Sequence, residues 1–235
     1  MARASGTSLA EYDRRLLRDG VSLLAGVDEA GRGPLAGPVV AAAVILRPDA
    51  ALPQVTDSKL LTARQRERAF PRILEQAEAA GLGIADRERI DRVNILEAAL
   101  AAMAFALCGL RTRPDLILVD GTAVPRLLPA KLAGVPLRPL VGGDRTSLAV
   151  AAASIIAKCV RDSIMRGCDR LYPGYGFAAH KGYGTPAHLA ALRRLGPCPI
   201  HRRSFAPVRE LLASVPHAPN GSRSSRPGPS CMSGA

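Results

Sequence analysis

The sequence has no tryptophan, and aromatic residues make up only 3% of its 235 positions. A core without large rings has to be built from aliphatic side chains, and hydrophobic residues do reach 48% of the chain. No stretch approaches the ~18 uninterrupted apolar residues that a membrane-spanning helix requires, and the first residues lack the apolar segment of a secretion signal. We therefore expect a cytoplasmic protein with no membrane partner.

Paired cysteines are also missing. The five cysteines are odd in number, lie far apart and form no Cys-x-x-Cys pair. This spacing argues against a disulfide framework and against a zinc site, so we expect reduced, structural thiols. The positions are Cys108, Cys159, Cys168, Cys198 and Cys231.

Acidic residues are scarce, since 20 Asp and Glu against 32 Lys and Arg give a net charge of +12. Clustered cations neutralise phosphates and release counterions, so this charge points to a polyanionic partner. The chain is long enough to bury a substantial core. Its length suits one α/β domain followed by a tail or by a small helical appendage.

Apolar periodicity predicts strands and helices that alternate along the chain. Thr62 and Gln65 have the spacing of a capping box that opens a helix, and Pro71 should break or kink that helix. The apolar stripe of a later helix should bury Leu96 in the core. The expected strands are 23–27, 37–46, 81–85 and 116–120, and the expected helices are 9–18, 62–79, 91–110, 147–165, 186–195 and 207–214.

The most informative stretch is Val27–Pro34, where Asp28 and Glu29 end an apolar strand and the turn Gly31-Arg32-Gly33 follows at once. Carboxylates at a strand end commonly hold hard divalent cations, and arginine meets a phosphate through a planar fork of donors. Glycine lets the backbone approach a ligand closely. The stretch therefore indicates metal-assisted work on a phosphate. A charged β-turn on a solvated surface is the alternative that the stretch alone leaves open.

Two further acids stand where a sheet would bring them near Asp28 and Glu29. Asp120 ends the strand expected over 116–120, and Asp144 lies just ahead of the next expected helix. A parallel-type sheet gathers strand ends, and four carboxylates are what a two-metal phosphodiesterase needs. Taken singly, Asp120 could be a turn residue and Asp144 a helix N-cap. Successive side chains of a regular strand point to opposite faces, so Asp28 and Glu29 should share a site only if the chain leaves strand geometry there.

Other polar residues fit plainer roles. Asp57 could cap a turn and Asp162 most simply pairs with a neighbouring charge, so neither is placed among the metal ligands. His180 and His201 sit beside cations in loops and are expected at the surface, whereas His188 fits helix packing. The sequence has no Gly-x-x-x-x-Gly-Lys phosphate loop, and its spacing supports no Ser-His-Asp arrangement.

With these residues in view, the sequence resembles the bacterial type 2 ribonucleases H. The stretch Asp28–Val40 is similar to the full signature of that family, and supporting motifs follow in the family's order over residues 9–212. These motifs are Asp57-Ser58-Lys59, Asn94-Ile95-Leu96, Val119-Asp120-Gly121, Gly143-Asp144, Ala153–Lys158, Arg161-Asp162, Tyr172-Pro173, His180–Thr185 and Arg203-Ser204-Phe205.

The resemblance implies an α/β fold of the RNase H-like type, with a mixed β-sheet flanked by helices and a small helical C-terminal portion. It divides the chain into a catalytic core over 1–170, a helical portion over 171–214 that completes the substrate site, and a tail over 215–235. We expect the tail to be disordered, because it is rich in Pro, Ser and Gly.

The resemblance also implies an activity, namely endonucleolytic hydrolysis of RNA paired with DNA. The expected substrates include duplex DNA with one embedded ribonucleotide, cut on the 5′ side of that nucleotide to leave 5′-phosphate and 3′-hydroxyl ends. The turn Gly31-Arg32-Gly33 resembles the loop that senses the ribose 2′-hydroxyl, the one group that distinguishes RNA from DNA. Tyr183 resembles the tyrosine that stacks on the sugar at the RNA–DNA junction. The residues that resemble the family's catalytic ligands of two Mn²⁺ or Mg²⁺ ions are Asp28, Glu29, Asp120 and Asp144.

Two positions depart from the family pattern. Gly142 stands where the family often has lysine, which removes a cation beside Asp144, and Thr122 replaces the asparagine of an Asp-Gly-Asn motif. The first departure bears on metal affinity and not on the reaction class. Type 3 enzymes have a signature that differs at the position of Arg32, so type 2 is expected.

Two other functions stay open from the residues alone. A non-catalytic basic nucleic-acid-binding protein would explain the net charge, but four converging acids would repel a phosphate backbone unless cations intervene. Another RNase H-like phosphodiesterase, such as a resolvase or integrase, should lack the turn 31–33 and Tyr183. We expect a monomer whose partner is nucleic acid, either an RNA–DNA hybrid or DNA with embedded ribonucleotides. The sequence does not indicate a sliding clamp as a partner.

Overall fold

A mixed five-stranded β-sheet forms the centre of the computed structural model, which describes residues 6–214. The strand order is β3-β2-β1-β4-β5, with antiparallel pairing on the β2 side of β1 and parallel pairing on the β4 side. The expected disordered tail, 215–235, lies outside the described residues. The strands are β1 (Leu24–Ala30), β2 (Val39–Leu46), β3 (Ala77–Ala85), β4 (Leu116–Asp120) and β5 (Leu137–Leu140).

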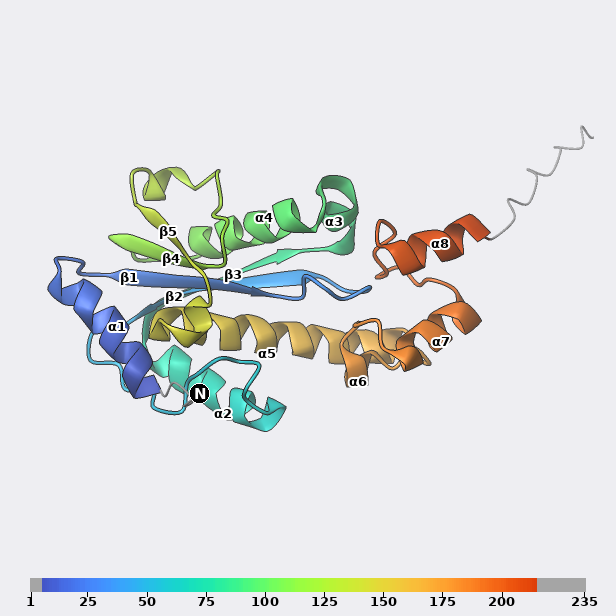
Figure 1. Cartoon of the computed structure of the whole chain (residues 1–235), viewed down its shortest axis with the longest axis horizontal. Helices are drawn as coiled ribbons and strands as arrows, with labels where there is room; N and C mark the ends of the chain where they lie inside the picture. The colour runs from blue at the N-terminus through green and yellow to red at the C-terminus, as the bar shows by residue number, and fades with distance from the viewer. Residues whose placement is uncertain (1–5, 215–235) are drawn as a thin grey trace, which may run out of the picture.

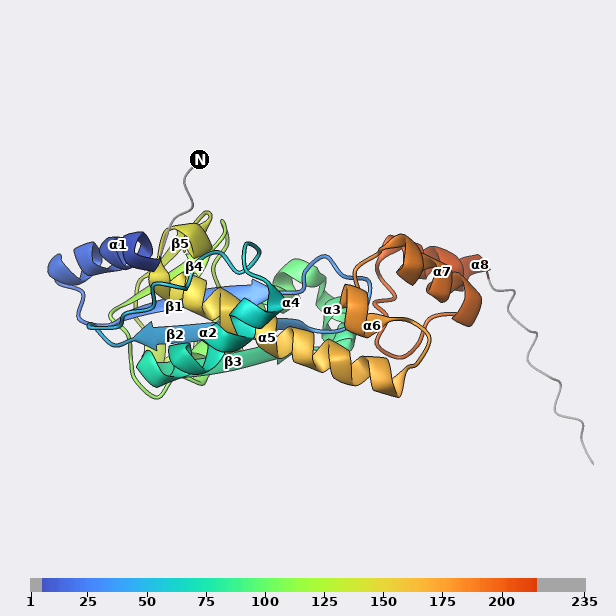
Figure 2. The same cartoon turned by 90° about the horizontal axis from the view of Figure 1, so that it is seen from below.

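Helices cover both faces of the sheet. Helix α4 and the shorter α3 lie on one face, and α5, α2 and α1 lie on the other (Figure 1). The last three helices, α6 to α8, lie beyond one end of the sheet in both views (Figures 1 and 2). The helices are α1 (Gly6–Arg18), α2 (Ala63–Gln76), α3 (Arg87–Val93), α4 (Ile95–Cys108), α5 (Leu148–Leu171), α6 (Phe177–His180), α7 (Pro186–Leu195) and α8 (Ala206–Ser214).

The continuous apolar run of β2 follows from burial on both faces. Ala41 and Ala43 join the core under α4, whereas Ala42 and Val44 join the core under α5 and α2. Because a strand covered on both sides needs apolar residues at every position, no alternation is visible in the sequence. The fold is the predicted mixed sheet flanked by helices, with a helical portion at its C-terminal end.

Helix α5 approaches the central strand very closely. A Cβ atom on Gly26 would lie 2.2 Å from the backbone carbon of Ala149, so only glycine permits this contact. On the other face, a Cβ on Gly83 would lie 1.9 Å from the carbonyl oxygen of Ala102 in α4. These contacts let the backbones of β1 and α5 fix each other's position, which matters because both elements carry polar residues of the site described below.

Several local predictions are corrected by the structure. The helix expected over 91–110 is two helices, α3 and α4, because Asn94 adopts φ 76° and its side chain accepts hydrogen bonds from Leu96 and Glu97 at the start of α4. Leu96 is 40% exposed and does not belong to the core stripe.

Pro71 does not break the helix that contains it. The capping box of Thr62 and Gln65 is formed as predicted, and α2 then continues through Pro71 to Gln76, although the expected end was residue 79. Pro71 is exposed, so water can hydrate the carbonyl group that the missing N–H leaves free.

Strand β5 was not predicted, because its residues lie in a proline-rich connection. It pairs parallel to β4 at the edge of the sheet and includes Pro139. Proline is tolerated on an edge strand, since its missing N–H can face away from the ladder. Strand β3 and helix α5 are each longer than predicted.

Within residues 6–214, no helix combines the length and the apolar character needed to cross a membrane. The four cysteines of this part of the chain are all unpaired, as predicted.

Candidate active site

The sheet leaves one edge of β1 open near its carboxyl end. Strand β4 pairs with β1 only as far as Val27, whereas β2 continues to pair with β1 up to Ala30. Asp28 and Glu29 therefore remain in strand geometry but have no β4 partner beside them. The prediction that the chain must leave strand geometry here is wrong. Strand β1 continues to Ala30, and both Asp28 and Glu29 line the pocket beside the point where β4 stops pairing with β1.

Residues of five separate segments line a pocket of about 220 Å³ at this edge. Asp28 and Glu29 come from β1, and Asp120 comes from the end of β4. The predicted ribose-sensing turn and Tyr183 line the same pocket. The other polar lining residues, which the sequence did not single out as site residues, are Ser58, Lys59, Ser154 and Lys158.

Asp144 is adjacent to this group and does not line the pocket. It lies in the 3₁₀ turn Gly143–Arg145 and is 2% exposed. The N–H of Gly143 donates a hydrogen bond of 2.7 Å to Asp120 Oδ1, which ties this turn to the end of β4. Ser147 caps α5, so Asp144 is not the helix N-cap that the sequence left open.

Burial and neighbouring carboxylates raise the pKa of both Asp28 and Glu29. Burial raises the pKa of Asp28 well above its ordinary value, and the charges of Glu29 and Asp120 add to the rise. Burial also raises the pKa of Glu29, against the opposing effect of Arg32, whose Nη1 lies 3.5 Å from Glu29 Oε1. The pocket therefore holds three acidic side chains close together, with the cations Arg32, Lys59 and Lys158 also in its lining.

Asp144 belongs to the same electrostatic group. Burial raises its pKa, the carboxylates of Asp57 and Asp120 contribute, and Lys59 opposes them. Lys59 Nζ lies 3.3 Å from Asp144 Oδ2. Lys59 thus supplies a cation beside Asp144 in a chain that has Gly142 where the family often has lysine.

The donor set fits a hard divalent cation. Its members are carboxylate oxygens, which such ions prefer, and the repulsion between them is what a bound cation would relieve. Within residues 6–214, however, no three Asp, Glu, His or Cys side chains converge closely enough to form a ready metal site.

Two buried arginines hold the predicted ribose-sensing turn from behind. Arg202 is 0% exposed and donates to the carbonyl oxygens of Gly31, Arg32 and Gly37. Arg161 is also 0% exposed and donates to the carbonyls of residues 36, 38 and 181. The turn is therefore fixed to both α5 and the C-terminal portion.

The turn and Tyr183 face each other. Gly31 has φ 101°, and a Cβ on it would lie 2.0 Å from Arg161 Nε, so no other residue fits. A Cβ on Gly33 would lie 3.7 Å from the ring of Tyr183, which is 43% exposed. The guanidinium of Arg161 lies 5.9 Å from the centre of that ring.

Arg161 and Arg202 were not predicted as site residues, and His201 was predicted at the surface but is 1% exposed. Arg161 and Arg202 bond to segments more than a hundred residues away, and His201 packs against other rings inside the C-terminal portion. The sequence offered one indication of their importance. Arg161 lies in the family motif Arg161-Asp162, and His201 and Arg202 come directly before the motif Arg203-Ser204-Phe205.

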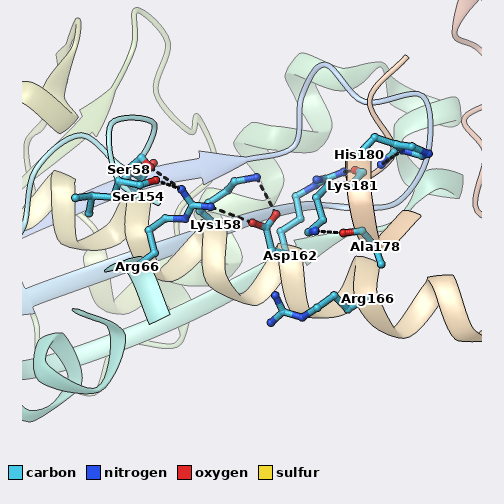
Figure 3. A network of polar contacts seen from close by, with 12 residues as sticks. Ser58, Arg66, Ser154, Lys158, Asp162, Arg166, Ala178, His180 and Lys181 are labelled. Carbon is cyan, nitrogen blue, oxygen red and sulfur yellow. Dashed lines mark hydrogen bonds and ion pairs between the residues drawn. The ribbon is translucent and has the colours of Figure 1, made fainter. Parts of the chain in front are cut away.

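A polar network extends from the pocket along α5 (Figure 3). The hydroxyls of Ser58 and Ser154 lie 2.8 Å apart. Asp162 pairs with Lys158 at 2.7 Å and with Arg66 at 3.4 Å, which confirms that this acid serves a neighbouring charge. The prediction for Asp57 is confirmed as well, since its side chain accepts the N–H of Lys59 in a turn.

The fold has solved counterparts. The chain superimposes on ribonuclease H2 from Pyrococcus horikoshii with a TM-score of 0.67 and 30% sequence identity, covering 80% of this chain and 96% of that one. Ribonuclease HII of Archaeoglobus fulgidus, solved as a complex with PCNA, gives a TM-score of 0.59 at 25% identity, covering 78% and 95%. Bst-RNase HIII in complex with Mn²⁺ gives 0.61 at 22% identity, covering 81% and 69%, which supports the fold alone. The protein thus has the RNase H-like fold that was predicted.

The sequence comparisons give the family. The family described as Ribonuclease HII matches residues 25–208. Ribonuclease HII of Geobacillus thermodenitrificans is 54% identical over 211 residues, which is 90% of this chain and 79% of that protein. Ribonuclease HII of Syntrophotalea carbinolica is 52% identical over 202 residues, 86% of this chain and 93% of that protein. The chain belongs to the ribonuclease HII family and is a ribonuclease H of type 2, a hydrolase that acts on nucleic acid.

Proposed function

We propose that this enzyme hydrolyses the RNA strand of RNA–DNA hybrids and also cuts duplex DNA on the 5′ side of a single embedded ribonucleotide. The products would carry 5′-phosphate and 3′-hydroxyl ends. The observation that carries the proposal is the shared pocket, in which strand-end carboxylates, the turn 31–33 and Tyr183 face the same space. A hydrolytic centre and a ribose-reading surface are then adjacent.

The proposed catalytic residues would hold two Mn²⁺ or Mg²⁺ ions. Two observations support this. The side chains offer only oxygen atoms as ligands, and their buried carboxyl groups lie close enough to raise the pKa of their neighbours. Such ions activate a water molecule and stabilise the leaving oxygen of a phosphodiester. The ligands would be Asp28, Glu29, Asp120 and Asp144.

The remaining pocket residues are proposed to read the substrate. Backbone groups of Gly31 and Gly33 can contact a 2′-hydroxyl where side-chain bulk would interfere. Arg32 can meet a phosphate, and the exposed ring of Tyr183 can stack on the sugar. Lys158, which lines the pocket, adds a cation on the side of α5.

We also propose that 1–170 forms the catalytic core, that 171–214 completes the substrate site, and that the enzyme acts as a monomer. Both sides of this boundary contribute to the pocket, since Tyr183 follows it and the carboxylates precede it.

The test is cleavage of a DNA duplex that contains one ribonucleotide, compared with a continuous RNA–DNA hybrid and an all-DNA duplex, in Mg²⁺ and in Mn²⁺. The proposal expects cuts in the first two substrates and none in the third. Cleavage of the all-DNA duplex would indicate another RNase H-like phosphodiesterase. Binding without cleavage in either metal would indicate a non-catalytic nucleic-acid-binding protein.

A further inference from the structure

A cluster of histidines lies directly behind Tyr183. His188, in α7, is 0% exposed, and His201 is 1% exposed. The ring of His180 stacks on that of His188, with centroids 4.4 Å apart and planes inclined by 15°. Phe177 packs against all three rings. Imidazoles this deeply buried cost free energy unless their nitrogens are hydrogen-bonded, so their partners are informative.

The hydrogen bonds of His188 and His201 form a chain with one direction. The N–H of Cys198 donates to His201 Nδ1 at 2.9 Å, so His201 carries its proton on Nε2. That Nε2 lies 3.1 Å from His188 Nε2, which must accept. His188 therefore carries its proton on Nδ1, which donates to the carbonyl oxygen of Tyr183 at 2.8 Å. The chain ends on the main chain of Tyr183.

Neighbouring bonds fix the same loop to the ribose-sensing segment. The N–H of Gly182 donates to His180 Nδ1 at 3.1 Å, and its carbonyl accepts the N–H of Leu35 at 2.8 Å. Ala36 forms an isolated β-bridge with His201. One hydrogen-bonded unit therefore contains the histidines, the loop of Tyr183 and the residues after Gly33. His180, a member of this unit, is drawn in Figure 3.

The chain of bonds exists only while both rings are neutral. A proton added to His188 would place two N–H groups face to face at the 3.1 Å contact, and a proton added to His201 would face the N–H of Cys198. Burial lowers the pKa of His201 to about 4 and also lowers the pKa of His188. The ionisable groups that act on the two rings are His180, Cys198 and each other, and no carboxylate of the described residues is among them.

We propose that His188 and His201 are positioning residues, a neutral ring pair that fixes the main chain at Tyr183 and thereby sets the preference for a ribonucleotide–deoxyribonucleotide junction over a continuous hybrid. Neither ring lines the pocket, so neither is a catalytic residue. The inference rests on the proposed function, because it assigns the junction preference to the loop that carries Tyr183. It adds that this preference depends on residues behind the loop.

The test compares His188→Gln with His188→Asn. The Asn amide occupies the position of Nδ1 and can still donate to Tyr183 O. The Gln amide occupies that of Nε2 and removes the side-chain donor, so that this carbonyl keeps only the N–H of Thr185. We expect H188Q to lower kcat/KM on the junction duplex about tenfold, through KM more than kcat, with less than about threefold change on the continuous hybrid. H188N should keep most of the junction preference.

Two controls keep the test decisive. Leu107→Ala, in the separate core under α4, should lower the melting temperature and leave the junction preference unchanged. If neither variant at 188 folds, ¹⁵N NMR of the wild-type rings at pH 7 should find His188 protonated on Nδ1 and His201 on Nε2. The opposite tautomers, or a charged ring, would overturn the inference.

The outcomes separate this inference from the proposed function. A wild-type enzyme that cuts no junction duplex contradicts the proposed function itself. A wild-type enzyme that prefers the junction, together with an H188Q variant of equal preference, overturns only the positioning role. The positioning role would also be overturned if Leu107→Ala lowered the junction preference as much as H188Q does. A general loss of stability would then be enough to explain the effect of H188Q.

Discussion

At the scale of single residues, buried charge is concentrated around the pocket. Asp28 and Asp144 are 4% and 2% exposed, and Arg161 and Arg202 are each 0% exposed. An ionised group without solvent is costly, so a fold keeps it only where partners or function compensate. The arginines find backbone carbonyls, whereas Asp28 has two other acids nearby and Asp144 contacts Lys59. The buried acids are therefore the side chains for which we propose a metal-binding role.

Asp120→Asn should keep substrate binding and lower cleavage by at least about a hundredfold. The amide preserves the shape and can still accept the N–H of Gly143, but it weakens a proposed metal ligand. Binding and single-turnover cleavage in Mg²⁺ and Mn²⁺ measure the two effects. Asp49→Asn, at an exposed position, is the matched control. Full activity of D120N in either metal would contradict its role.

Tyr183→Ala should reduce cleavage at a ribonucleotide junction by about tenfold or more, because it removes the ring proposed to stack on the sugar; the comparable stacking of a base on an aromatic ring contributes roughly 1–3 kcal/mol. The melting temperature should change little, since the ring is 43% exposed. Phe105→Ala removes a ring that is 50% exposed in α4 and should leave cleavage unchanged. Unaltered turnover of Y183A on the junction duplex would remove Tyr183 from the site.

At the scale of elements, the position of α5 against β1 determines where the site residues stand. Asp28 comes from β1 and Ser154 from α5, and the hydrogen bond between their side chains lowers the pKa of the carboxyl against the larger effect of burial. The backbones can approach this closely only because Gly26 has no side chain. Helix α5 then continues past the sheet to Leu171 and carries Arg161 toward the C-terminal portion.

Gly26→Ala should therefore destabilise the fold by about 1–3 kcal/mol, because its Cβ would overlap the backbone of α5. Gly167→Ala is the control within α5, where a Cβ meets nothing within 4 Å and where alanine favours the helix. Denaturant unfolding of both variants measures the difference. Equal stabilities would mean that α5 can move away from β1 without loss.

Asp13 joins α1 to the start of α5 and predicts a pH effect. Its Oδ2 accepts the N–H of Ala149 at 2.9 Å, and burial raises its pKa to about 6 from an ordinary value of 3.8. The folded state thus holds this proton more tightly than the unfolded chain does. The resulting stabilisation is complete below pH 3.8 and is lost as the pH rises through 6.

Asp13→Asn stays neutral and keeps an oxygen for the N–H of Ala149. It should raise the free energy of unfolding by up to about 3 kcal/mol at pH 7.5, with the difference disappearing toward pH 4. Thermal unfolding of both proteins across this range provides the measurement. A difference that does not depend on pH would show that the carboxylate is not destabilised by its surroundings.

At the scale of the whole molecule, a net charge of +12 contrasts with the carboxylates that stand together in the pocket. The cations can hold the backbone of a nucleic acid, while the acids stand where a divalent ion would be needed between protein and phosphate. Two cations lie beside the pocket, Lys158 of α5 and Arg66 of α2. Both form an ion pair with Asp162 (Figure 3). The molecule thus combines a net charge suited to polyanions with a local group of carboxylates at which we propose that metal binds.

Substrate affinity should therefore fall by at least about tenfold between 50 and 200 mM salt, because bound phosphates release counterions. Equilibrium binding of a hybrid duplex to the D120N variant measures this without cleavage. The melting temperature of the free protein over the same range serves as the control. An affinity that does not change with salt would contradict electrostatic binding by the basic surface.

Local chemistry made much of the fold predictable. The capping box of Thr62 depends on residues three positions apart. The strands β1, β2 and β4 are visible in the sequence as short apolar runs. Strand β5 and the break at Asn94 were missed, because an edge strand tolerates proline and a positive φ is not visible in a helical stripe. The candidate carboxylates were predicted because acids at strand ends are unusual in a basic chain.

The sequence by itself determined the family and the mixed sheet and supplied the candidate acids, since motifs and apolar runs are local properties of the chain. Only the tertiary structure decided that β4 ends early enough to leave Asp28 and Glu29 at one open edge, and that Arg202 and His201 are buried behind the substrate-facing loops. These features depend on contacts between segments distant in the sequence, such as Val27 with Val119 and Arg202 with Gly31, and in such contacts burial and pairing are settled by packing.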